Sequence, residues 1–172
     1  LNKVDAVVTD PPYGIDYKPF SKNWDGSKKI VKKIIGDDVK FNPSFLLQYP
    51  SVIIWGANNF NDLLPVGDLL IWDKRTKKHL DSMIGDPCEV AYMTTKKRSH
   101  VKIFRLMHGG VVNADSTKGN NEERHHPTQK PIELMRWCVE MYEHHHTILD
   151  PFMGSGTTGV ACAKMGRTFT GI

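Results

Sequence analysis

The sequence predicts an α/β domain built around a doubly wound, largely parallel β-sheet. Three observations predict this fold class. Short apolar runs rich in Val and Ile alternate with segments of helical periodicity. A glycine-rich turn at residues 153–157 joins one apolar run to a helical segment. The first apolar run ends in the tetrapeptide Asp10-Pro11-Pro12-Tyr13, whose two prolines stop the strand.

The predicted elements follow one another in the order that such a fold requires. Strands of the sheet are expected at residues 4–9, 51–55, 69–72, 89–93, 147–150 and 168–172. A further run, residues 101–106, alternates with charges and predicts a half-exposed strand. A helix is expected at residues 131–142, because apolar side chains recur there at helical spacing. A second helix is expected at residues 157–165, after the glycine-rich turn and before Gly166. Residues 14–41 and 107–126 are predicted as loops.

Length and composition place the chain among ordinary globular domains. It has 172 residues and a formal net charge of +4, which permits nucleic acid as a partner without requiring it. No apolar run approaches the length of a membrane span. The wide spacing of Cys88, Cys138 and Cys162 predicts reduced, buried packing residues in a cytoplasmic protein. Both ends, at Leu1 and Ile172, fall within apparent strands, and we expect a fragment trimmed at both ends.

The tetrapeptide Asp10-Pro11-Pro12-Tyr13 is the first candidate site. Two consecutive prolines fix φ and remove two backbone donors, so a carboxylate and an aromatic ring stand on a stiff, extended tether. Backbone carbonyl groups there lack the pairing that a strand would give them. This arrangement suits a flat ligand that carries an amino group. Taken alone, the tetrapeptide is better explained by a strand-ending turn with a capping aspartate and a surface tyrosine, and two later motifs reverse this preference.

The second candidate site is a glycine-rich loop. Gly154-Ser155-Gly156-Thr157-Thr158-Gly159 matches G-x-G-x-x-G between a strand and a helix, the context of a nucleotide-cofactor loop. NAD or FAD would be the usual ligand, but the carboxylate of Asp150 precedes the loop and would repel a pyrophosphate. It suits a ligand with positive charge, such as S-adenosylmethionine, and Phe152 adds an apolar face. The acid expected to bind the ribose would fall at or beyond Ile172.

The third motif is His126-Pro127-Thr128-Gln129-Lys130-Pro131, directly before the clearest predicted helix. Taken together and in this order, the three motifs resemble those of the amino-methylating DNA methyltransferases that use S-adenosylmethionine. The tetrapeptide comes first and the glycine loop last, an order that resembles the beta class of these enzymes from bacteria and phages. The resemblance extends over residues 5–172.

The resemblance implies a Rossmann-like class I methyltransferase fold with a circularly permuted motif order. Its sheet would have seven strands, of which one, at residues 89–93, is antiparallel. Because we count six strands for the sheet, one family strand is expected before Leu1. Residues 1–172 would form a single catalytic domain, and residues 96–125 a short target-recognition segment.

The resemblance also assigns roles to residues. Asp10 and the carbonyl of Pro11 would accept hydrogen bonds from the amino group of a flipped base, and Tyr13 would stack on that base. No metal is required. The implied catalytic residues are Asp10, Pro11, Pro12 and Tyr13, and the implied cofactor-binding residues are Asp150, Pro151, Phe152, Gly154, Ser155, Gly156, Thr157, Thr128, Gln129 and Lys130.

Basic residues follow several predicted strands and are candidates for contact with DNA. The ends of parallel strands meet at one edge of a sheet, so two clusters are expected on the edge that carries Asp10 and Asp150. The candidates are Lys28, Lys29, Lys74, Arg75, Lys77, Lys78 and Arg105, with His108, Asn113 and Lys118 in the recognition segment. A homodimer and a restriction partner are further expectations.

The acidic first position of the tetrapeptide favours the N6 amino group of adenine in DNA as the target. Methylation of cytosine at N4, methylation of RNA or single-stranded DNA, and a cofactor-binding or DNA-binding module without activity remain the alternatives.

Overall fold

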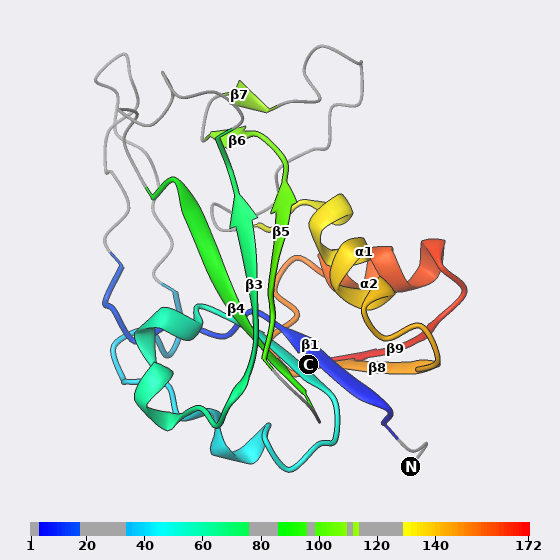
Figure 1. Cartoon of the computed structure of the whole chain (residues 1–172), viewed down its shortest axis with the longest axis horizontal. Helices are drawn as coiled ribbons and strands as arrows, with labels where there is room; N and C mark the ends of the chain where they lie inside the picture. Colours follow the sequence, from blue (N-terminus) through cyan, green and yellow to red (C-terminus); the bar gives the residue numbers. More distant parts are fainter. Residues whose placement is uncertain (1–3, 18–33, 76–85, 96–98, 110–111, 114–128) are drawn as a thin grey trace.

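A computed structural model describes residues 4–17, 34–75, 86–95, 99–109, 112–113 and 129–172 of the chain. Its centre is a seven-stranded sheet with strand order β5-β3-β4-β2-β1-β8-β9 (Figure 1). The strands are β1 (Ala6–Thr9), β2 (Val52–Trp55), β3 (Gly67–Asp73), β4 (Cys88–Thr94), β5 (Val101–Arg105), β8 (Thr147–Asp150) and β9 (Thr168–Gly171). The helices are α1 (Ile132–Glu140) and α2 (Thr157–Lys164), and short 3-10 turns lie at Pro43–Phe45, Ala57–Asn59 and Asn61–Leu63.

Strand direction confirms the predicted mostly parallel sheet. β1 is parallel to β2 and β8, β8 is parallel to β9, and β3 is parallel to β5. Only β4 among these seven strands runs antiparallel, to both β2 and β3, as predicted for residues 89–93. The carboxyl ends of β1, β3 and β8 therefore share one edge of the sheet, which the site uses.

The predicted count of six sheet strands is wrong. The alternating run that we expected to be a half-exposed strand is β5, which pairs with β3 in parallel register from Leu69↔Val101 to Asp73↔Arg105 and forms the seventh strand. Val101 and Ile103 are exposed, as alternation predicts for an edge strand. Part of the predicted loop after residue 106 also differs, because β6 (His108–Gly109) and β7 (Val112–Asn113) form a short antiparallel ladder.

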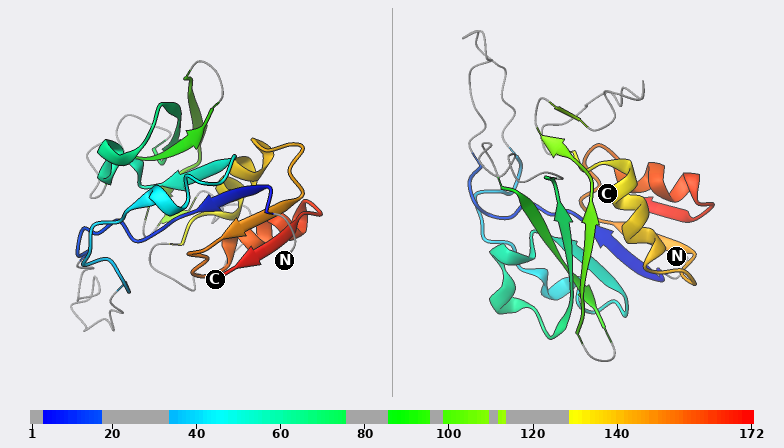
Figure 2. Two further views of the ribbon diagram at one scale, coloured as in Figure 1. Left: turned by 90° about the horizontal axis from the view of Figure 1, so that it is seen from below. Right: turned by 45° about the horizontal axis from the view of Figure 1, so that its top comes forward.

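The sheet has two apolar faces, each covered by a different part of the chain. Ala6 and Val8 of β1 belong to the core that includes α1 and α2, whereas Val7 packs with Leu46 and Phe60 near the 3-10 turns. Figures 1 and 2 show α1 and α2 next to each other at one side of the sheet. The period of two along β1 therefore places successive side chains in opposite layers.

Both predicted helices are confirmed, with shifted ends. α1 begins at Ile132, after the extended Pro131, and the side chains at the predicted helical spacing are buried. α2 begins at Thr157 as predicted and ends at Lys164. Among the described residues, no helix is long and apolar enough to cross a membrane.

The cysteine prediction holds for two of three residues. Cys138 and Cys162 are buried against the sheet, and burial raises the pKa of their thiols to about 12 and about 11. Cys88 is exposed, so its predicted burial is wrong. It is the first residue of β4, opposite Asp73 at the end of β3.

One buried hydrogen bond ties the neighbouring strands β1 and β8 together. Thr9 Oγ1 donates to Asp150 Oδ1 at 2.6 Å, and the two residues are 0% and 2% exposed. We expect Thr9→Val to lower the free energy of unfolding by about 2 kcal/mol, because a buried carboxylate oxygen loses one of its two donors. Urea denaturation followed by tryptophan fluorescence measures this. Thr170→Val, the same change at an exposed position of β9, is the control, and equal stability of the two variants would contradict the assignment.

Candidate active site

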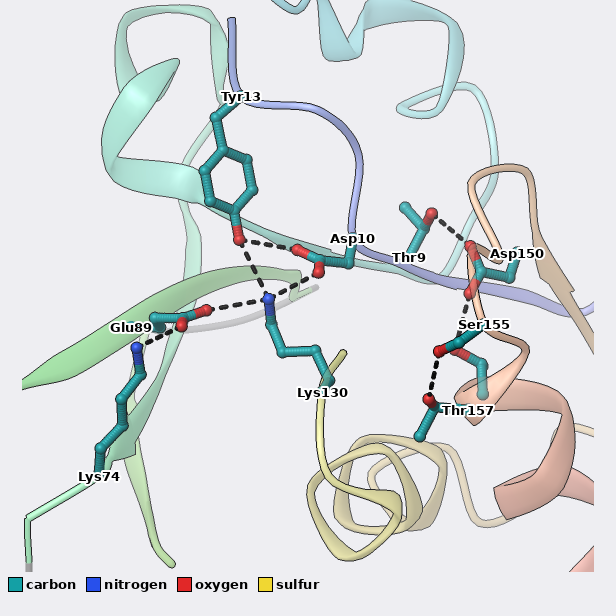
Figure 3. A network of polar contacts seen from close by, with 10 residues as sticks. Thr9, Asp10, Tyr13, Lys74, Glu89, Lys130, Asp150, Ser155 and Thr157 are labelled. Atoms are coloured by element: carbon teal, nitrogen blue, oxygen red, sulfur yellow. Dashed lines mark hydrogen bonds and ion pairs between the residues drawn. The ribbon is translucent and has the colours of Figure 1, made fainter. Parts of the chain in front are cut away.

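The ends of β1 and β8 bring the first two motifs to the same edge of the sheet. β1 and β8 are adjacent and parallel, with Ala6 opposite Ile148 and Val7 opposite Leu149. Asp10 follows the last residue of β1, and Asp150 is the last residue of β8. The double-proline turn and the glycine-rich loop therefore leave neighbouring strands side by side, as the sequence predicts (Figure 3).

Tyr13 is fixed by its hydroxyl group and by a glycine that sequence analysis did not single out. Its hydroxyl donates to Asp10 Oδ1 at 2.7 Å. Its ring packs on Gly56, which follows β2 with φ of 77°; a Cβ at Gly56 would lie 2.1 Å from Tyr13 Cε1. Only glycine accommodates both that close approach and the left-handed backbone. The strand-ending Trp55-Gly56 pair was the available signal for this position.

Lys130 is the centre of the polar network. Its Nζ donates to Asp10 Oδ2 at 2.6 Å and to the Tyr13 hydroxyl oxygen at 3.2 Å. The same amine forms an ion pair at 2.9 Å with Glu89 Oε2, an oxygen that makes no well-aligned hydrogen bond. The Lys130 side chain is 8% exposed. Sequence analysis assigned Lys130 to the cofactor; the structure places its amine against the tetrapeptide.

Glu89 and Lys74 extend the network along the sheet edge (Figure 3). Lys74 Nζ lies 2.5 Å from Glu89 Oε1 and 5.1 Å from the centre of the Trp72 ring. The four charged side chains alternate in sign along the chain of contacts, from Asp10 through Lys130 and Glu89 to Lys74. Lys74 was predicted to contact DNA; in the structure its side chain is 18% exposed and its amine pairs with Glu89.

The protonation states in this network follow from burial and neighbouring charge. Burial, and next the charge of Asp10, raise the pKa of Tyr13 well above its usual value, so the phenol stays neutral and remains a donor. Burial opposes the charge of Lys130, but Asp10, Tyr13 and Glu89 outweigh it and raise its pKa. Burial also opposes ionisation of Glu89, yet Lys130 and Lys74 lower its pKa to about 2. Lys130 and Glu89 are therefore charged at neutral pH.

Asp150 has a different environment from Asp10. It is 2% exposed, and its oxygens accept hydrogen bonds from Thr9 Oγ1, from Thr158 Oγ1 at 2.7 Å and from the Phe152 N–H at 3.1 Å. Burial raises its pKa, although the three donors oppose that shift. The predicted role, a carboxylate open to a cationic ligand, does not agree with this geometry. Asp150 instead fixes the start of the glycine-rich loop to β1 and α2.

The glycine-rich loop presents backbone to solvent beside this buried carboxylate. Gly154 and Gly156 have φ of 49° and 79°, so both positions favour glycine. A Cβ at Gly156 would meet nothing within 4 Å, which leaves open space next to the first turn of α2. Gly156 caps that helix without a side-chain hydrogen bond, and Ser155 and Thr157 share one at 3.1 Å. The loop thus offers backbone donors and space to an anionic group.

Phe152 joins the loop to an aromatic cluster. Its ring lies 5.5 Å from Phe41 and 6.4 Å from Phe45, both in edge-on arrangements. Phe152 and Pro151 are half-buried, and Phe45 is exposed. This cluster gives the loop an apolar wall, in keeping with the predicted apolar face for a ligand.

Asp37 is a second residue that sequence analysis missed. It is 3% exposed, and its carboxylate accepts from the backbone N–H groups of Gly14 at 2.9 Å and Tyr17 at 2.7 Å. Its carbonyl oxygen accepts from the Asp16 N–H at 2.7 Å. These bonds hold the chain directly after Tyr13. The Gly36-Asp37-Asp38 turn signal was present in the sequence, but its partner lies 23 residues away.

The other predicted contacts are dispersed or outside the described residues. Gln129 is half-buried next to Lys130, Arg105 is exposed with a 3.3 Å ion pair to Asp73, and the Arg75 N–H donates to the Asp73 carboxylate at 3.0 Å. The described residues include no group of three His, Cys, Asp or Glu side chains placed to hold a metal. Lys28, Lys29, Lys77, Lys78, Lys118 and Thr128 lie outside the described residues.

Comparison with known proteins places this site in a family. Residues 20–172 match the N6/N4 methyltransferase family, described as DNA methylase. The chain belongs to the N6/N4 DNA methylase family. Members of this family transfer a methyl group from S-adenosylmethionine to DNA. The family resemblance inferred from the three motifs is therefore confirmed, and so is the methyl donor.

Two related proteins and one solved structure illustrate the similarity. This N6/N4 DNA methylase is 50% identical over 206 residues to the Type II methyltransferase M2.LlaDCHI of Lactococcus lactis subsp. cremoris, covering 98% of this chain and 77% of that protein. It is 30% identical over 190 residues to the methylase-like protein YubD of Escherichia coli (strain K12), covering 99% and 76%. The cytosine-N4-specific PvuII DNA methyltransferase shares the fold, with a TM-score of 0.56, 13% identity and coverage of 98% and 74%.

Asp37 provides a test of how the turn after Tyr13 is held. We expect Asp37→Ala to lower the rate of DNA methylation at least about tenfold, since three backbone N–H groups lose their acceptor. Hydrogen exchange at residues 14–17 should become faster in the same variant. Asp62→Ala is the control, because this carboxylate belongs to an exposed pair with Lys40. Unchanged exchange in Asp37→Ala would contradict the assignment.

Proposed function

We propose that this chain methylates the N6 amino group of adenine in DNA, with Asp10 as the acceptor that orients the amino group. The observation that carries the proposal is the fixed carboxylate of Asp10, held by Tyr13 and Lys130 at the sheet edge beside the glycine-rich loop. The family includes enzymes for adenine N6 and cytosine N4. The acidic first residue of the tetrapeptide favours adenine.

The residues of the loop fit the donor of the methyl group. Bound S-adenosylmethionine supplies a methyl group on a positively charged sulfonium. The open space at Gly156 and the first turn of α2 would hold its carboxylate through backbone N–H groups. Phe152, fixed by Phe41, would supply an apolar surface. Asp150 positions this loop from within the core rather than by contact with the donor.

Asp10 has capacity left for the base. Each carboxylate oxygen has two lone pairs, and each Asp10 oxygen accepts one side-chain hydrogen bond in the structure, from Tyr13 or Lys130. The Asp10 side chain is 22% exposed, so the base can approach it. Together with the Pro11 carbonyl, Asp10 would turn the amino group so that its lone pair points at the methyl group. Its negative charge would stabilise the positive charge that develops on nitrogen.

The base reaches this site only outside the double helix, so it is flipped out of the duplex. Tyr13, whose half-buried ring packs on Gly56, would stack on the base. Arg105 and Arg75, on the same edge of the sheet, are the described basic residues that we propose for phosphate contact. DNA as the substrate places the activity in the bacterial cytoplasm. A homodimer and a restriction partner remain predictions.

The product identifies the function. Unmethylated duplex DNA, single-stranded DNA and RNA are each incubated with the protein and S-adenosylmethionine carrying a labelled methyl group, and the digested nucleosides are separated by mass. We expect N6-methyladenine from duplex DNA. N4-methylcytosine would overturn the choice of base, and label in RNA alone would overturn DNA as the substrate.

Asp10→Ala tests the assigned acceptor in the same assay. We expect its methyl-transfer rate to fall at least about a hundredfold, because the developing charge loses its counter-charge. Calorimetric binding of S-adenosylmethionine should persist, since the loop is held by Asp150. Asp86→Ala, an exposed aspartate just before β4, is the control. Full activity of Asp10→Ala would contradict the mechanism.

A further inference from the structure

Glu89 has a position that the proposed chemistry does not explain by itself. It lies on β4, opposite Trp72 of β3, and its two carboxylate oxygens contact two different lysines. The Glu89 side chain is 23% exposed, and that of its partner Lys130 is 8% exposed. A carboxylate placed this deeply next to a reactive aspartate is costly to desolvate, so its charge must be balanced by its partners.

We propose that Glu89 is a positioning residue for methyl transfer, which with Lys74 sets the charge around Asp10 by holding Lys130 between two carboxylates. This inference rests on the proposed function, because it concerns the acceptor role of Asp10. Sequence analysis assigned no role to Glu89 and assigned Lys74 to DNA. In the structure Glu89 contacts Lys130 directly, and Lys74 contacts Glu89.

The first reason is the sharing of one ammonium group. Lys130 Nζ has three donors and three neighbouring acceptors: Asp10 Oδ2 at 2.6 Å, Glu89 Oε2 at 2.9 Å and the Tyr13 hydroxyl at 3.2 Å. Without the charge of Glu89, the ammonium would be attracted to Asp10 alone. It would then compete more strongly with the amino group of the base for the lone pairs of Asp10.

The second reason is the net charge of the cluster. Asp10 and Glu89 contribute two negative charges, and Lys130 and Lys74 contribute two positive charges, so the cluster is neutral. Methyl transfer brings positive charge onto the amino nitrogen next to Asp10. A cluster that had lost only the Glu89 charge would carry one net positive charge and would oppose this step.

Lys74 makes the balance testable. It ends the row of contacts, with its amine on Glu89 Oε1 and over the Trp72 ring, and it does not touch Asp10. Removing its charge together with that of Glu89 returns the cluster to neutrality, while Asp10, Tyr13 and Lys130 remain. A charge-balance role and a purely structural role of Glu89 therefore predict opposite results for the double variant.

The experiment compares wild type, Glu89→Gln and Glu89→Gln/Lys74→Gln in single-turnover methyl transfer at saturating DNA and S-adenosylmethionine. We expect Glu89→Gln to lower the rate at least about tenfold, while the Kd for S-adenosylmethionine stays within about threefold. The double variant should be at least about fivefold faster than Glu89→Gln. Glu140→Gln, which makes the same change in an exposed pair with Arg136, is the control and should match wild type.

Each outcome decides the question. An unchanged rate in Glu89→Gln, or a double variant no faster than the single one, overturns the proposal. If Glu89→Gln does not bind S-adenosylmethionine, the double variant is compared directly with wild type, and a rate within about tenfold of wild type supports the charge balance. If neither variant binds it, Glu89 serves folding and the proposal fails. A wild-type protein that transfers no methyl group would instead refute the proposed function.

Discussion

A buried ammonium group determines how this site is assembled. The amine of Lys130 lies in the interior, where an unpaired charge would be strongly unfavourable, and it is stabilised by contacts from two other segments of the chain. Asp10 is 120 residues away in sequence, and Glu89 belongs to the antiparallel strand β4. The turn after β1, the strand β4 and the segment before α1 must therefore meet for the charge to be satisfied. The polar network of the site therefore forms only when these three segments have come together.

The two aspartates at the strand ends have separate physical tasks. Asp150 is enclosed and accepts three hydrogen bonds from hydroxyl and backbone donors, so it acts as a structural link between β8, β1 and α2. Asp10 accepts from only two side-chain donors and remains partly open. Similar residues at neighbouring strand ends thus differ in function because their surroundings differ. One positions the glycine-rich loop, and the other is the acceptor that we propose for the amino group of the base.

The positions of the motifs could be predicted from the sequence because they depend on local rules. Prolines after Asp10 end a strand, and glycines before Thr157 begin a helix. Parallel pairing then brings these ends together, since the carboxyl ends of parallel strands share an edge. The antiparallel direction of β4 followed only from the family resemblance. The edge strand β5 was miscounted because alternation shows a half-exposed strand but does not show its partner.

The partners of the charged side chains could not be predicted in the same way. Whether Lys130 faces a ligand or Asp10 depends on side-chain geometry across segments that are far apart in sequence. Glu89 points to Lys130 because its register on β4 places it opposite Trp72, a detail that no sequence pattern fixes. Asp37 likewise binds backbone N–H groups 20–23 residues away, which leave no trace in composition or periodicity.

The role of Lys130 is the central claim, and one comparison tests it most directly. Lys130→Met keeps the length and apolar stem of the side chain but removes its charge. We expect its Kd for S-adenosylmethionine to stay within about threefold of wild type, while the single-turnover methyl-transfer rate at saturating donor falls at least about a hundredfold. A normal rate at saturating donor, combined with a large loss of affinity for S-adenosylmethionine, would contradict the account and assign Lys130 to the cofactor.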